Sequence, residues 1–75
     1  NPMLKVYPNP VQTGILMIEN SDIYIGEQLQ VIDVMGRVVH THTLTATQNQ
    51  VDVSSLVKGI YFVKVKGNTS KVVVM

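Results

Sequence analysis

The chain has 75 residues, a formal net charge of +1 and an apolar fraction of 45%. This length allows one domain with a modest core, and the near-neutral charge excludes the electrostatic footprint of a nucleic-acid-binding protein. The sequence has no cysteine, which excludes disulfides and thiolate metal sites. No apolar run approaches the roughly 18 residues of a membrane-spanning helix, so we expect no membrane insertion.

Apolar residues recur with a period of two, which is typical of strands, and turn signals separate the apolar segments. The sequence predicts seven strands, at 5–7, 15–19, 27–34, 37–44, 50–53, 60–66 and 71–75. Since no helical segment of useful length intervenes, parallel βαβ units are excluded. We therefore expect an all-β fold, a seven-strand antiparallel immunoglobulin-like β-sandwich. Residues 1–75 are predicted to form one domain and to be a piece of a longer protein, with 1–4 as a linker remnant.

Two connections have the residues of hairpin turns. Asp33 suits the first position of a type I turn, and Gly36 follows where φ can be positive. We expect Gly36→Val to be harmful, because a β-branched residue adopts positive φ only at a cost. Gly67 and Asn68 predict a second hairpin turn, between the last two strands.

The other connections are predicted less directly. Pro8 and Pro10 should take the first strand, a sheet edge, out of the sheet in a turn. Residues 20–22 predict a turn before an apolar patch at 23–25, and 45–49 predict a polar loop. Residues 54–58 favour one turn of 3₁₀ helix with Ser54 as its cap.

No group of residues predicts catalysis. His40 and His42 share one face of a strand, but no carboxylate lies near them and a catalytic zinc needs three protein ligands. We interpret both histidines as residues of a solvent face. The serines lie in turns outside any glycine-flanked elbow, and the carboxylates show no acid–base pairing. We expect no enzyme activity, no catalytic or metal-binding residue and no cofactor.

Binding functions remain open. Tyr7, Tyr24 and Tyr61 could form a stacking platform for a sugar, although Tyr61 shares the phase of core residues. The apolar strand 71–75 could pair with another chain, including a second copy in a homodimer. After Asp52 every charged residue is a lysine. These lysines form either a solvated strand face or a docking surface for an acidic partner.

Four segments, taken together, resemble the C-terminal sorting domain of proteins exported by the type IX secretion system of Bacteroidota. Residues 6–10 are similar to the opening motif of that family, and 29–39 to its strand, Asp-x-x-Gly-Arg turn and strand. Residues 51–65 are similar to its Ser-x-Leu-x-x-Gly-x-Tyr block, and 71–74 to its closing strand. Each pattern is common alone, but four in order form a specific signal. Family members end on a basic residue, whereas this chain stops at Met75.

The resemblance implies a secretion signal that rides at the C-terminus of a cargo protein through the periplasm. An outer-membrane translocon would recognise the domain. A cell-surface sortase would remove it and attach the cargo to lipopolysaccharide, at the cell surface or outside the cell. The alternatives are a β-sandwich accessory module for carbohydrate binding and a self-association domain. The residues that the resemblance implies for recognition are Pro8, Asn9, Pro10, Asp33, Gly36, Arg37, Gly59, Tyr61, Lys71, Val72, Val73 and Val74.

Overall fold

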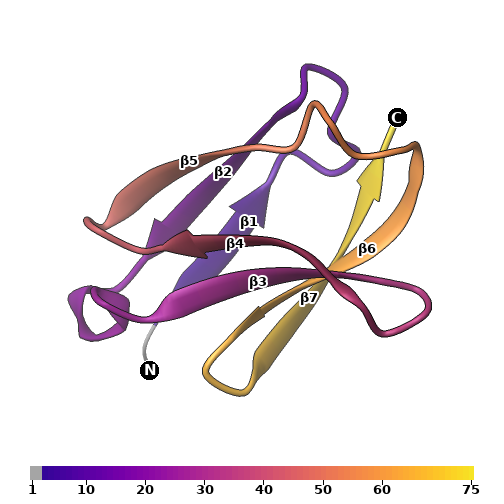
Figure 1. Ribbon diagram of the computed structural model, residues 1–75. Helices are drawn as coiled ribbons and strands as arrows, with labels where there is room; N and C mark the ends of the chain where they lie inside the picture. The colour runs from indigo at the N-terminus through magenta and orange to yellow at the C-terminus, as the bar shows by residue number, and fades with distance from the viewer. Residues whose placement is uncertain (1–2) are drawn as a thin grey trace.

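The computed structural model describes residues 3–75 and confirms the predicted all-β antiparallel sandwich (Figure 1). Its two sheets have three and four strands, in the orders β1-β2-β5 and β4-β3-β6-β7. The seven strands are β1 (Leu4–Tyr7), β2 (Ile15–Asn20), β3 (Gln28–Asp33), β4 (Val38–Thr43), β5 (Gln48–Asp52), β6 (Gly59–Val65) and β7 (Asn68–Val74). The predicted linker 1–4 lies partly outside the described residues, and Leu4 already belongs to β1.

The core lies between the two sheets and is built from alternate residues of the strands. In β6, for example, Tyr61, Val63 and Val65 are buried while the residues between them face outward. Fourteen buried apolar residues form one cluster, and all but two of them are aliphatic. Because consecutive side chains of a strand point to opposite faces, this alternation sets which face of each strand turns inward.

The connections give the sandwich its immunoglobulin-like topology. The β3–β4 and β6–β7 hairpins stay within the four-stranded sheet, whereas β2–β3, β4–β5 and β5–β6 cross between the sheets. In the three-stranded sheet β1 is an edge strand, as predicted from its prolines. A β-bulge interrupts the β3–β4 pairing, where Val31 faces His40 but Ile32 faces Val38.

The 3₁₀ helix lies elsewhere than the sequence predicted. The structure has no helix at 54–58, where the backbone N–H of Leu56 donates to the Val53 carbonyl in a simple turn. The 3₁₀ helix, η1, covers Asp22–Tyr24, within the segments predicted as a turn and an apolar patch. Tyr24 explains the difference, since this residue is only 6% exposed and anchors the turn to the core.

Two predicted boundaries also change. The last hairpin turns at Lys66 and Gly67, which both have positive φ, and Asn68 is already paired with Val65. Two consecutive residues with positive φ are typical of a type I′ turn, which matches the twist of the flanking strands. The predicted polar loop 45–49 is wrong at its end, because Gln48 and Asn49 belong to β5.

The sandwich has two ends, and the strand ends define them (Figure 1). The connections 8–14, 34–37 and 53–58 and the end of β7 lie together, at the top and right of the figure; we call this the motif end. The connections 21–27, 44–47 and 66–67 lie at the opposite, far end, where β1 also begins. Over the described residues, the structure has no helix long and apolar enough to cross a membrane.

Candidate recognition site

The opening and closing segments of the chain meet at the edge of β7. The Asn9 side-chain amide donates to the Lys71 carbonyl at 3.1 Å, and its oxygen accepts from the Val73 backbone N–H at 3.0 Å. One side chain therefore provides hydrogen-bond partners for the free backbone groups at the edge of β7, as a neighbouring strand would. The pairing joins residues 62 and 64 positions apart in the sequence.

Val11 continues this contact with its backbone. The Val11 N–H donates to the Val73 carbonyl at 2.8 Å, and the Val11 carbonyl accepts from the Met75 N–H at 2.9 Å. Val11 is buried and forms a parallel bridge with Val74. The segment 9–11, which we call the strap, thus leaves the three-stranded sheet and covers the last part of β7, the edge strand of the other sheet. Such cover protects an edge from pairing with another chain.

The β3–β4 turn is organised by Asp33. One carboxylate oxygen accepts from the backbone N–H groups of Met35 and Arg37, both at 2.9 Å. The other carboxylate oxygen accepts from the Arg37 guanidinium at 2.9 Å. The Gly36 N–H donates to the Asp33 carbonyl at 3.0 Å, and Gly36 has a φ of 85°, as the sequence predicted. The hydrogen bonds from Arg37 and Met35 to the ionised carboxylate lower the pKa of Asp33.

The turn after β5 has a similar carboxylate, Asp52, which the sequence analysis did not include among the recognition residues. Asp52 accepts from the Ser54 backbone N–H at 2.9 Å and from the Ser54 hydroxyl at 2.6 Å. Both hydrogen bonds favour the ionised form and lower the pKa of Asp52.

Gly14 packs against this turn, and a Cβ there would lie 2.9 Å from the Ser54 Cβ. Its φ of 81° is also in the region that favours glycine. Gly14 directly precedes β2, but its contact partner Ser54 is 40 residues away in the chain and could not be found locally.

Tyr61 fixes the connection between β5 and β6. Its hydroxyl donates to the Val57 carbonyl four residues upstream, and the residue is 8% exposed. This contact resembles the tyrosine corner of sandwich domains, in which a tyrosine hydroxyl holds the preceding turn. Gly59 is the first residue of β6, lies opposite Val74 and has a φ of 154°.

The twelve predicted recognition residues gather at the motif end and in the adjacent halves of β6 and β7. The strap joins Pro8, Asn9 and Pro10 to the closing strand, and Gly59 joins that strand to the Tyr61 turn through the β6–β7 pairing. Asp33 lies opposite Tyr61, so the Asp33–Gly36–Arg37 turn adjoins the same block. None of the twelve lies in a connection of the far end, over the residues that the structure describes.

The prediction that the two histidines lie on a solvent face was wrong. His40 and His42 lie opposite Val31 and Leu29, which are buried, so the rings lie on the inner side of β4 and are half-buried. A His42 ring nitrogen lies 3.4 Å from the Asn49 side-chain oxygen, across the seam between the sheets. The described residues contain no group of three side chains suited to a metal ion, and no pocket.

A tyrosine platform is not formed. Tyr24 and Tyr61 are buried in the core, which confirms the core position inferred for Tyr61. The hydroxyl of Tyr24 accepts a hydrogen bond from the Asn68 amide at 3.0 Å. Tyr7 lies on the outer face of the three-stranded sheet, with the Lys5 ammonium 5.2 Å from its ring centre. One half-buried ring does not make a stacking surface for sugars.

Two comparisons with known proteins bear on this site. The profile of a family described as the secretion system C-terminal sorting domain matches residues 5–75. Beta-agarase A of Zobellia galactanivorans is 27% identical to the chain over 70 residues. That similarity covers 92% of this chain but only 13% of the agarase. The chain is therefore similar to a small part of that larger protein.

Proposed function

Because the chain belongs to the family of type IX secretion system C-terminal sorting domains, we propose that it is the export signal of a larger cargo protein, read by the outer-membrane translocon. The family consists of sorting signals rather than enzymes. Membership implies that the protein carrying this domain is exported, to the cell surface or the medium. The finer steps of the proposal are passage through the periplasm, recognition as a folded domain, and removal by a cell-surface sortase.

The observation that carries the proposal is the gathering of the four family motifs at one end of the sandwich. Residues from 8–10, 33–37, 59–61 and 71–74 come from both ends and the middle of the chain, yet they form one contiguous block. Turns held by Asp33, Asp52 and Tyr61 give this block a fixed shape. A rigid block of turns suits recognition, because binding then costs little conformational entropy.

The orientation of β1 supports the same proposal. β1 begins at the far end, so a cargo joined upstream of Leu4 would leave the domain away from the motif end (Figure 1). The motif end would then stay accessible while the cargo is attached. A sortase that cuts upstream of β1 would act at the far end, without competing for the same surface.

Homodimerisation through the last strand meets an obstacle. The strap already occupies the outer edge of β7 from Lys71 to Met75. A second copy could pair there only if Asn9 and Val11 left the edge. Strand exchange between two copies would therefore require the strap to be displaced first. No observation favours the carbohydrate-binding alternative, whose tyrosine platform is absent over the described residues.

The test is a reporter protein with an N-terminal export signal and residues 1–75 at its C-terminus. It is expressed in a type IX-competent strain and in an isogenic strain without the translocon. We expect the reporter at the surface or in the medium of the first strain and in the periplasm of the second. Equal retention in the periplasm of both strains would contradict the proposed function, provided that the purified fusion is folded.

A further inference from the structure

The outer face of the four-stranded sheet carries adjoining apolar side chains near the motif end. Ile32 lies opposite both Val38 and Phe62, and Ile60 lies opposite Val73. Val38 is 48% exposed and Ile60 41%, while the other three are half-buried. We call these five residues the Phe62 patch. The three-stranded sheet packs on the opposite, inner face, so no element of residues 3–75 covers the patch.

The position of Phe62 makes this patch unusual for a small domain. It is the only phenylalanine of the chain, yet it lies outside the core, which is made of aliphatic residues and two tyrosines. Burial of a phenylalanine in the core would remove more apolar surface from water than most of the valines there. A continuous apolar surface outside the core marks an interaction site more often than scattered exposed residues do.

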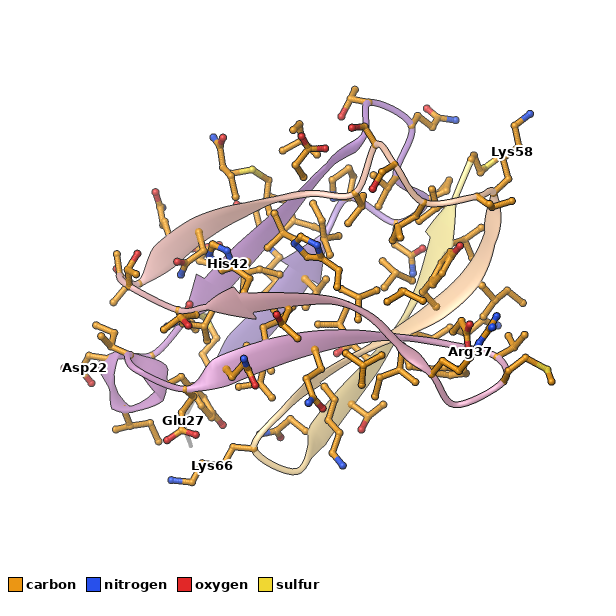
Figure 2. All side chains as sticks on the ribbon, viewed as in Figure 1. Asp22, Glu27, Arg37, His42, Lys58 and Lys66 are labelled. Atoms are coloured by element: carbon orange, nitrogen blue, oxygen red, sulfur yellow. The ribbon has the colours of Figure 1, made fainter. Side chains whose placement is uncertain are left out.

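The rim of the patch is basic. Lys71 lies opposite Phe62, Lys64 lies two residues from Phe62 on the same face, and Arg37 directly precedes Val38. The Arg37 side chain is 76% exposed, and Figure 2 shows it at the β3–β4 turn. Among the described residues, four acidic side chains lie in other strands or in connections away from this face: Glu19, Asp22, Glu27 and Asp52. Asp33 ends β3 in register with the buried Tyr61, and its carboxylate accepts from the Arg37 guanidinium at 2.9 Å, so Lys64 and Lys71 are the rim cations without this neighbour.

We infer that the Phe62 patch docks onto an apolar protein surface rimmed by carboxylates, on a component of the secretion machinery; this inference rests on the proposed sorting function. The apolar centre would supply burial, and the rim of Lys64, Lys71 and Arg37 would supply orientation and a fast encounter with an acidic partner. A second copy fits poorly, because face-to-face pairing would bring two cationic rims together. A lipid surface also fits poorly, because the patch lies on a pleated sheet and has no protruding tryptophan.

The test uses the reporter fusion described above with matched variants. Lys64→Glu/Lys71→Glu reverses the rim, and Val38→Thr makes the patch more polar. The controls are Lys5→Glu, on the outer face of the three-stranded sheet, and Ile23→Thr, an exposed apolar residue of the far end. Circular dichroism of each purified chain checks that it is folded.

We expect the rim variant to lower surface reporter by about tenfold and the controls to leave it within about twofold. Equal export of the folded rim variant, Val38→Thr and both controls would overturn the docking face while the sorting function stands. Retention of the unmodified reporter in the periplasm would overturn the sorting function and the docking face with it.

Binding of the two alternative partners, a second copy of the chain and a lipid surface, is measured directly on the purified chain. Light scattering reports a second copy, and sedimentation with vesicles of equal parts phosphatidylcholine and phosphatidylglycerol reports a lipid surface. If the unmodified chain formed a dimer or bound vesicles, and the rim variant abolished this, the inference of a protein partner would be overturned in favour of the second copy or the lipid surface. A monomer that leaves the vesicles unbound, together with the export loss, supports the protein partner.

Discussion

At the scale of single residues, Asn20 and Asn49 are the buried polar side chains of the described chain. Asn49 donates to the Asn20 oxygen at 3.2 Å and to the Ala46 carbonyl at 2.9 Å, and it accepts from the Thr45 N–H at 3.1 Å. The structure leaves no buried side-chain polar atom unpaired over the described residues. These two side chains therefore hold the β4–β5 connection to the end of β2.

Asn49→Ala should lower the free energy of unfolding by about 1–3 kcal/mol, because the Asn20 oxygen and the Thr45 N–H lose a partner inside the protein. Urea denaturation of the purified chain measures this change. The exposed neighbour Gln50→Ala is the control and should stay within about 0.5 kcal/mol. Equal effects of the two substitutions would show that the network adds nothing to stability.

Asp33 and Asp52 make stability depend on pH. Both have a pKa lowered below the ordinary 3.8, so their stabilising hydrogen bonds are present above that value and are lost as the pH falls through the lowered pKa. We expect the thermal midpoint to be level between about pH 7 and 5 and to fall below about pH 4. Asp33→Asn/Asp52→Asn should flatten this fall. If the thermal midpoint of the double variant fell with pH as it does in the unmodified chain, the loss of stability in acid would come from other groups.

At the scale of elements, the strap is the contact that joins the first and last motifs. Asn9→Ala removes two hydrogen bonds from the edge of β7 and should cost about 1–2 kcal/mol. Hydrogen exchange locates the effect, since the Val73 amide should exchange faster while amides of the β2–β5 pair keep their protection. Gln12→Ala, an exposed change beside the strap, is the control. Unchanged protection at Val73 in Asn9→Ala would contradict this role of the strap.

The β3–β4 turn gives a second prediction for an element. Gly36 has a φ of 85°, and a Cβ there would meet no atom within 4 Å, so backbone conformation alone opposes substitution. Gly36→Val should destabilise the domain by about 1–2 kcal/mol and reduce export of the reporter, whereas Gly36→Asn should be tolerated because asparagine adopts this conformation more readily. Thermal unfolding and surface reporter measure the two effects. If asparagine were as harmful as valine, the glycine would be needed for another reason.

The strands and the β3–β4 turn could be predicted because their signals are local. Alternation in β6 and the Asp33–Gly36 spacing each lie within a few residues. The strap, the strand position of Asn49 and the Gly14–Ser54 contact could not be predicted. Each depends on a partner far away in the sequence: Val73 for Asn9, Asn20 for Asn49, and Ser54 for Gly14.

At the scale of the whole molecule, the two ends of the sandwich differ in what they carry. The motif end carries the family motifs and the edge covered by the strap, and Figure 2 shows Arg37 and Lys58 there. The far end carries η1, the start of β1 and the Lys66–Glu27 ion pair at 3.8 Å, and the same figure labels Asp22, Glu27 and Lys66 at this end. This division predicts that substitutions of equal kind have unequal effects on export at the two ends.

The most direct test compares Arg37→Glu with Lys66→Glu in the reporter fusion. Both residues are exposed, lie in hairpin turns and pair with one carboxylate, Arg37 with Asp33 and Lys66 with Glu27, but at opposite ends of the domain. We expect Arg37→Glu to lower surface reporter by about tenfold and Lys66→Glu to leave it within about twofold, with both chains folded. Equal loss, or loss with Lys66→Glu alone, would contradict recognition at the motif end.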